Sequence, residues 1–322
     1  MLNFVARRIA LTAVSVWGVV TLVFVLLHLT PGDPAVLLLS GGGVSPSPAA
    51  VAALRAKLHL NAPLLTQYWH FLTSLAGGNL GTSFQSGTSV SRELATAFPR
   101  TIELIVLAGL FALVVGVTAG SIAGWREGGV FDRAITVIST LGIAVPVFVV
   151  AIVLVRIVAV GFNLLPVEGY AGLGQGLGQN LRYAILPSLS LSFGLASVIA
   201  RVTRAAIVEV RRQDWVLAAR AKGLRLPALV ARHVLRNALG AVVTISGLQL
   251  GALLGGSVLV EVVFSWPGMN MLLYNAAEQR DYPVVQGVVI VIAVAFSIIN
   301  LLTDLAYGLL DPRVRRRTQG AR

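Results

Sequence analysis

Cysteine is absent from this 322-residue sequence, and charged residues are scarce. The lack of thiols excludes disulfides, thiolate metal ligands and a cysteine nucleophile. With only four histidines, the chain offers little to a metal centre, so we expect no metal site and no cofactor of its own. Charged residues make up 12% of the sequence, about half of the ~25% found in soluble domains, and 56% of residues are hydrophobic. This balance predicts a membrane protein.

Motifs for nucleotide binding and for hydrolysis are also missing. No G-x-x-x-x-G-K-[ST] occurs, so the sequence has no P-loop, and neither G-x-S-x-G nor H-E-x-x-H is present. The apolar runs carry no carboxylate near their midpoints, which disfavours an ion-coupled secondary carrier. We therefore expect a chain that is not an enzyme and has no ATPase site of its own.

Six apolar runs are long enough to cross a hydrocarbon core of ~30 Å as helices at 1.5 Å per residue. In lipid they must be helical, because every backbone polar group needs a partner within the protein. The predicted fold class is an all-α membrane protein with six transmembrane helices. The runs are 9–29, 101–125, 134–155, 184–200, 238–260 and 284–303.

The 25 lysines and arginines are distributed unevenly between the two sides of the predicted membrane. If the N-terminus is cytoplasmic, all but seven of them fall in cytoplasmic segments, so the positive-inside rule places both termini in the cytoplasm. The same placement explains the net charge of +12 without nucleic acid as a partner. The seven outer cations are Arg55, Lys57, Arg92, Arg100, Arg156, Arg182 and Arg280.

The segments between the runs define the expected domain organisation. A small extracytoplasmic subdomain, with short helices near 49–58 and 63–75, should follow the first span. Acidic residues of the outer segments are expected to be solvated loop charges, and no residue is assigned to substrate binding; they are Glu168, Glu261, Glu278 and Asp281. The expected parts are 1–30 (N-terminus and first span), 31–100 (outer subdomain), 101–310 (core with the other five spans) and 311–322 (basic cytoplasmic tail).

The stretch 211–237 is basic and rich in alanine, although it lies between two apolar runs. Its composition predicts a short helix over 213–222, with Asp214 capping the start and Gly223 ending it in the left-handed conformation. A proline then fits the first turn of a second helix over 228–239. The small alanine face can enter a groove on another protein. The alternative is a basic amphipathic loop that lies on anionic lipid.

Three glycines in the fifth run, Gly247, Gly251 and Gly255, recur every four residues. Glycines on one helix face allow a second helix to approach closely. Packing within this bundle is one interpretation, and a contact with a partner subunit or with the translocation path is the other.

The stretch 211–237 resembles the "EAA" cytoplasmic loop of bacterial ABC-importer permeases, most closely the dipeptide/oligopeptide/nickel type. It departs from the general pattern at Leu217, where a glutamate is usual. The resemblance extends over essentially the whole chain. Its matching segments are PGDP at 31–34, GNLGTS at 78–83, PRTIEL at 99–104, DWV at 214–216, AKGL at 221–224, RHVLRNA at 232–238, FSWPGM at 264–269, RDYPVVQG at 280–287 and LDPRVR at 310–315.

The resemblance implies the type I ABC-importer permease fold and a place in the bacterial inner membrane as the first permease of a pair. It implies di- or oligopeptides as substrates, with nickel or glutathione as alternatives; the runner-up from another class is an ion-coupled carrier. The implied partners are a second homologous permease, two cytoplasmic ATPases that bind ATP, an extracytoplasmic substrate-binding protein and membrane lipid. The implied coupling loop is 205–237, and its ATPase-coupling residues are Asp214, Ala218, Ala219, Arg220, Lys222, Gly223 and Leu224.

Overall fold

The computed structural model describes residues 2–29, 35–36, 47–57, 61–214, 216 and 235–310. Over these residues the chain is helical, with no strand and one isolated antiparallel bridge between Thr82 and Ser89. The chain divides into two compact units, which are treated separately below. Unit 1 comprises Met1–Thr12, Thr101–Pro267 and Ala295–Arg322, and unit 2 comprises Ala13–Arg100 and Gly268–Val294.

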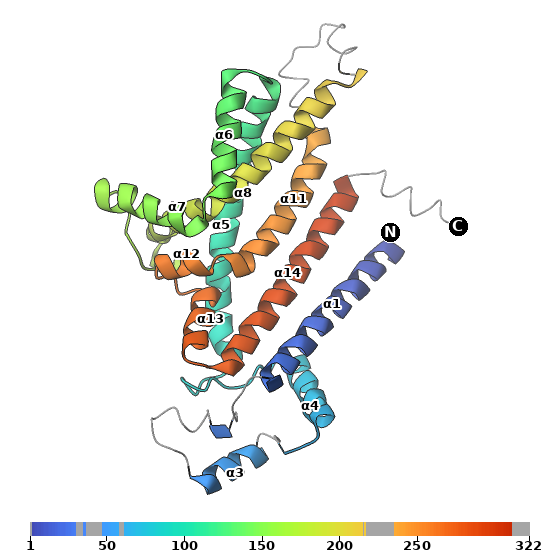
Figure 1. Cartoon of the computed structure of the whole chain (residues 1–322), viewed down its shortest axis with the longest axis vertical. Coiled ribbons are helices and arrows are strands. Elements are labelled where there is room, and N and C mark those ends of the chain that lie inside the picture. Colours follow the sequence, from blue (N-terminus) through green and yellow to red (C-terminus); the bar gives the residue numbers. More distant parts are fainter. Residues whose placement is uncertain are drawn as a thin grey trace. The chain divides into compact units, whose positions relative to one another are not determined.

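Within the described residues, four helices are long and apolar enough to cross a membrane (Figure 1). They contain the first, second, fourth and sixth predicted runs, and they extend beyond them because a helix can continue into polar flanks that hydropathy does not register. The second run, predicted from 101, belongs to a helix that begins at Val90. The four helices are α1 (Leu2–Leu29), α5 (Val90–Trp125), α8 (Leu177–Arg211) and α14 (Tyr282–Leu310).

The third predicted span, 134–155, is wrong as a straight helix. The helix α6 (Val130–Ala144) ends before Pro146, and the chain continues as α7 (Val147–Leu154) and the π-helix η2 (Val155–Gly161). The second part is bent by 107° from the first. Proline has no N–H and its ring clashes with the preceding turn, so a helix breaks there. Counting the bent pair as one span gives up to five candidate spans in the described chain, rather than six.

The fifth predicted run, 238–260, is also interrupted. Helix α11 (Leu235–Gly256) covers most of it and ends before the run does. A new short helix, α12 (Val258–Val263), begins after Ser257. Two consecutive glycines end α11, in keeping with the low helix propensity of glycine.

Unit 2 contains the two short helices expected after the first span, α3 (Pro48–Lys57) and α4 (Leu64–Ala76), and a later helix, α13 (Met269–Glu278). Helix α4 packs on α1. Thr21 and Tyr68 are joined by a hydrogen bond of 2.6 Å between their hydroxyl oxygens. Around it lies an apolar cluster of Val20, Val23, Phe71, Leu72, Leu75 and Ile290.

The core of unit 1 joins α5, α7, α8 and α12. Trp266 is fully buried, and its ring contacts Tyr170 edge-on with 4.7 Å between the ring centres. The backbone N–H of Gly169 donates to the carbonyl of Phe264 at 2.9 Å, so two loops close over this core together. The other fully or nearly buried members are Leu104, Ala108, Ala151, Ala159, Ala184, Leu186, Leu191, Val260 and Phe264.

Candidate functional site

The predicted coupling segment begins where α8 ends. Its residues Ala218, Ala219, Arg220, Lys222, Gly223 and Leu224 lie outside the described residues. Asp214 is helical and exposed. Val216 is 1% exposed and packs on Ile207 and Val210 of α8, and its N–H donates to the Gln213 carbonyl at 3.0 Å. The start of the segment is therefore held against the helix that precedes it.

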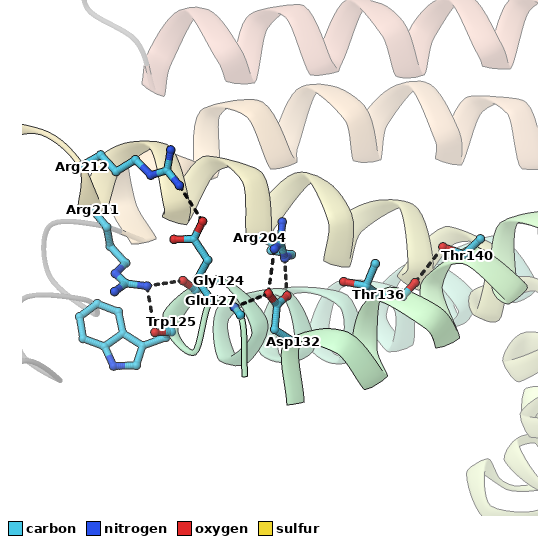
Figure 2. A network of polar contacts seen from close by, with 10 residues as sticks. Gly124, Trp125, Glu127, Asp132, Thr136, Thr140, Arg204, Arg211 and Arg212 are labelled. Carbon is cyan, nitrogen blue, oxygen red and sulfur yellow. Dashed lines mark hydrogen bonds and ion pairs between the residues drawn. The ribbon is translucent and has the colours of Figure 1, made fainter. Parts of the chain in front are cut away.

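A buried ion pair joins α8 to the first turn of α6 (Figure 2). Arg204 donates from Nε and Nη2 to the two carboxylate oxygens of Asp132, at 2.5 and 2.8 Å. Asp132 is 4% exposed, and it also accepts from the N–H of Gly128 at 2.9 Å. A bidentate arginine–carboxylate pair fixes both distance and orientation. The two helices therefore cannot slide past each other while the pair is intact.

Two further arginines bind the end of α8 to the turn between α5 and α6. Arg211 donates to the carbonyls of Gly124 and Trp125, at 2.7 and 2.9 Å, and its guanidinium carbon lies 4.9 Å from the centre of the Trp125 ring (Figure 2). It thus supplies donors and positive charge to the last carbonyls of α5. Arg212 pairs with Glu127 at 2.7 Å on the exposed side. We call Arg204, Arg211 and Arg212 the arginine clamp.

Three glycines allow α5 to approach α8 closely along the stretch of α8 that leads to the arginine clamp. A Cβ on Gly120 would lie 2.4 Å from the carbonyl oxygen of Ala200, and Cβ atoms on Gly116 and Gly124 would lie 2.8 and 2.9 Å from the carbonyls of Ala196 and Arg204. No side chain fits at such distances. The three glycines are four residues apart, the same spacing that singles out Gly247, Gly251 and Gly255. Sequence inspection of α5 could have found them by that signal.

The glycines of α11 do not share one environment. A Cβ on Gly247 would lie 2.0 Å from Thr303 Oγ1, and one on Gly251 would lie 2.9 Å from the Phe296 ring, so both lie close against α14. At Gly255 no described atom lies within 4 Å of an added Cβ. The structure therefore shows no covering neighbour for Gly255 among the described residues, and a contact there with a partner subunit or with the translocation path stays a prediction.

Two of the four acidic residues expected to be solvated are buried. Glu261 is fully buried and accepts from the hydroxyls of Thr101 and Ser257, at 2.8 and 3.2 Å. Glu168 and Glu278 are exposed, as expected. Glu278 accepts from the Tyr274 hydroxyl at 2.6 Å, and this hydrogen bond raises the pKa of Tyr274.

Asp281 is the other buried carboxylate, and its hydrogen bonds link two distant segments of the sequence within unit 2. It is 2% exposed and accepts from the hydroxyl of Ser83 at 2.5 Å and from the N–H groups of Phe84 and Gln85 at 3.1 and 3.2 Å. Its partners come from a turn 196 to 198 residues earlier in the sequence. Three donors satisfy a carboxylate that burial alone would destabilise. The side chain therefore has a structural role here.

Another polar contact in unit 1 joins α5 and α8 at a distance from the clamp. Asn180 donates to Glu103 Oε1 at 2.6 Å and to the carbonyl of Ala171 at 2.8 Å. Glu103 belongs to the predicted PRTIEL motif, and Asn180 lies in the first turns of α8. Helices α5 and α8 are thus linked by polar contacts near both ends and by glycine contacts between them.

Two family descriptions match the sequence. Residues 116–316 match "Binding-protein-dependent transport system inner membrane component", and residues 1–105 match the N-terminal part of the corresponding membrane components.

Relatives of known name match almost the full length. The di/tripeptide transport system permease protein DppB of Pseudomonas aeruginosa is 39% identical over 337 residues, covering 98% of this chain and 100% of the relative. DppB of Escherichia coli strain K12, a dipeptide permease, is 36% identical over 340 residues with the same coverage. The glutathione permease GsiC of Pectobacterium atrosepticum is 40% identical over 316 residues, covering 98% of this chain and 99% of the relative.

The fold has a counterpart among solved structures. A chain of the MetNI methionine ABC transporter, in an inward-facing conformation, superposes with a TM-score of 0.54 at 18% identity and covers 68% of this chain and 96% of its own length. Membership in a transport-subunit family favours the permease interpretation over the ion-coupled carrier. The chain is a multi-pass membrane protein, and it belongs to the inner membrane components of binding-protein-dependent transport systems.

Proposed function

We propose that this chain is the first of two homologous permeases in a type I ABC importer for di- or oligopeptides. It forms half of the translocation pathway with six membrane crossings, the broken α6–α7 pair and α11 among them. It has no ATPase site and no cofactor of its own, and it receives the energy of ATP hydrolysis through the loop after α8. Its further partners are two cytoplasmic ATPases, an extracytoplasmic substrate-binding protein and membrane lipid.

The observation that carries this proposal is the arginine clamp. The segment after α8 resembles a loop that docks on an ATPase, and the clamp ties the helix that leads into it to α5 and α6. A force applied to the loop is therefore delivered to three helices of unit 1 together. A basic loop that merely lay on lipid would need no such attachment.

Peptides are the substrate class that the named relatives support. Two of them are described as dipeptide or di/tripeptide permeases. Glutathione is the second candidate, because a glutathione permease is 40% identical to this chain. Since glutathione is itself a tripeptide, both candidates share amide backbone and terminal charges. Uptake assays with a dipeptide and with glutathione in the same vesicles separate them.

We further propose that both termini are cytoplasmic. Arg8 of α1 forms an ion pair with Asp304 of α14, which supports placing the two chain ends on the same side of the membrane. A reporter that is active only outside the cytoplasm should be active when fused after Ser74 and inactive when fused after Arg225. The reverse pattern of activity contradicts the orientation.

The coupling role is tested by Gly223→Val. A β-branched residue in the predicted left-handed position costs ~1–2 kcal/mol and redirects the helix before it. We expect peptide-stimulated ATPase activity of the reconstituted importer to fall several-fold, while the variant still co-purifies with its partners. Leu226→Val, three residues further along and outside the assigned coupling residues, serves as the control. Full stimulation in the Gly223 variant would remove the basis for this assignment.

A further inference from the structure

A cavity of about 190 Å³ lies in unit 1 where α6 gives way to α7. Its walls come from the end of α6, the start of α7, the middle of α8 and the last turns of α11. The volume is several times the ~30 Å³ that a water molecule takes in the liquid, and it is below the ~300–1,000 Å³ of pockets that enclose a drug-sized ligand. The cavity therefore has room for part of a small peptide.

The side chains that line the cavity are apolar except for Ser190 and Gln249, and none of them carries a charge. Pro146 has no N–H, so the carbonyl of Gly142 lacks the helical donor it would otherwise have. Ser190 donates its proton to the Leu186 carbonyl at 2.8 Å and can still accept a hydrogen bond. Gln249 of α11 brings both a donor and an acceptor. The apolar wall consists of Val145, Val147, Val150, Leu191, Leu195 and Leu253.

This combination matches the chemistry of a peptide bond. A peptide unit has one N–H and one C=O, and a glutamine amide can accept from the first or donate to the second. The side chains that flank the peptide unit need apolar surroundings. Charged termini do not suit the cavity, because no opposite charge lines it and their desolvation is costly. The neutral interior of a peptide is therefore the part that fits.

We propose that the cavity receives an internal peptide unit of the substrate during transport, and that the Gln249 amide hydrogen-bonds it. The inference rests on the proposed function, because it requires peptides to pass through this chain. Gln249 also lies between Gly247 and Gly251 in sequence, on a helix that packs against α14. The residue that we assign to the substrate therefore lies within two turns of the glycines through which α11 packs against α14.

The test uses the importer reconstituted with its ATPases, second permease and binding protein. Uptake of tetra-alanine is compared with uptake of its analogue methylated at the central peptide nitrogen, which cannot donate that hydrogen bond. We expect Gln249→Leu to lower kcat/KM for tetra-alanine by about 2- to 10-fold, the effect of losing one hydrogen bond, and to reduce the preference for tetra-alanine over the methylated analogue by the same factor. The unaltered and the variant importer use the same binding protein, so its own preference between the two substrates is the same in both measurements. Gln179→Leu, at an exposed glutamine, should keep the full preference.

A second variant reduces the cavity itself. Gly256 lines it, and no described atom lies within 4 Å of an added Cβ there, so Gly256→Leu should fold. We expect it to slow uptake of a tetrapeptide with phenylalanine at its two central positions more than uptake of tetraglycine. An unchanged peptide preference in Gln249→Leu, or unchanged size selectivity in Gly256→Leu, overturns the inference. Failure of the unaltered importer to transport any di- or oligopeptide instead contradicts the proposed function.

Discussion

Arg204→Ala is expected to destabilise the protein by about 3 kcal/mol, because it leaves the Asp132 carboxylate buried without its cation. The Asp132 side chain is 5% exposed and the Arg204 side chain 33% exposed, so the carboxylate cannot escape to water as easily as the guanidinium can. The variant should unfold at a lower temperature in detergent. Peptide-stimulated ATPase activity should fall further than basal activity, because the clamp joins the coupling segment to the other helices.

Two further variants, one at Asp132 and one at both residues, separate an effect on stability from an effect on coupling. Asp132→Asn keeps an acceptor for Arg204 and preserves side-chain volume, so its cost should be smaller than that of Arg204→Ala. Replacing both residues, as Asp132→Leu with Arg204→Met, removes the buried charge and should recover much of the thermal stability. If transport recovers in parallel with stability, the ion pair serves only folding. Stable protein that remains poorly stimulated supports a role in transmission.

Gly120→Ala is expected to have the second large effect, although it adds a single methyl group. The new Cβ would lie 2.4 Å from the carbonyl oxygen of Ala200 and 2.7 Å from Thr203 Cβ, and a backbone carbonyl cannot rotate away. Helices α5 and α8 must separate, at a cost of about 1–3 kcal/mol. Thermal unfolding in detergent measures this cost, and reduced expression of folded protein should accompany it.

Gly255→Ala is the matched control, because it is the same substitution within another helix. An added Cβ there meets no described atom, so the variant should be neutral or gain up to about 1 kcal/mol of helix propensity. Gly120→Ala should thus lower the thermal stability, whereas Gly255→Ala should leave it unchanged or raise it. Equal effects would show that α5 and α8 are not in close contact at Gly120, or that Gly255 is covered by another protein in the assembled importer.

Local composition was enough to predict the membrane class, four of the spanning helices and the two short outer helices. These features depend on runs of neighbouring residues. The bend at Pro146 could not be predicted, because both halves of 134–155 are equally apolar and proline is often accommodated in membrane helices. The sequence marks the position of the break and says nothing of its angle.

The buried carboxylates were missed for a different reason. Glu261 is bonded to Thr101, 160 residues away, and Asp281 to Ser83, 198 residues away. In the sequence Glu261 directly follows an apolar run and Asp281 lies in a polar segment, and an acidic residue at such a position is usually solvated. The clamp was missed for a similar reason. Its three arginines fit the positive-inside rule, while their partners lie about 70 to 90 residues earlier, at the end of α5, in the turn after it and at the start of α6. Only the glycines of α5 had a local signal that could have revealed them.

The hydrogen bonds between Asp281 and the turn 83–85 can form only late in synthesis. Ser83 leaves the ribosome 198 residues before Asp281. At ~5–20 residues per second, the turn 83–85 waits roughly 10 to 40 seconds for its carboxylate. During that time most of the apolar segments emerge and must enter the membrane. Nascent chains halted before residue 281 should therefore remain sensitive to protease at this turn, and release of longer chains should protect it.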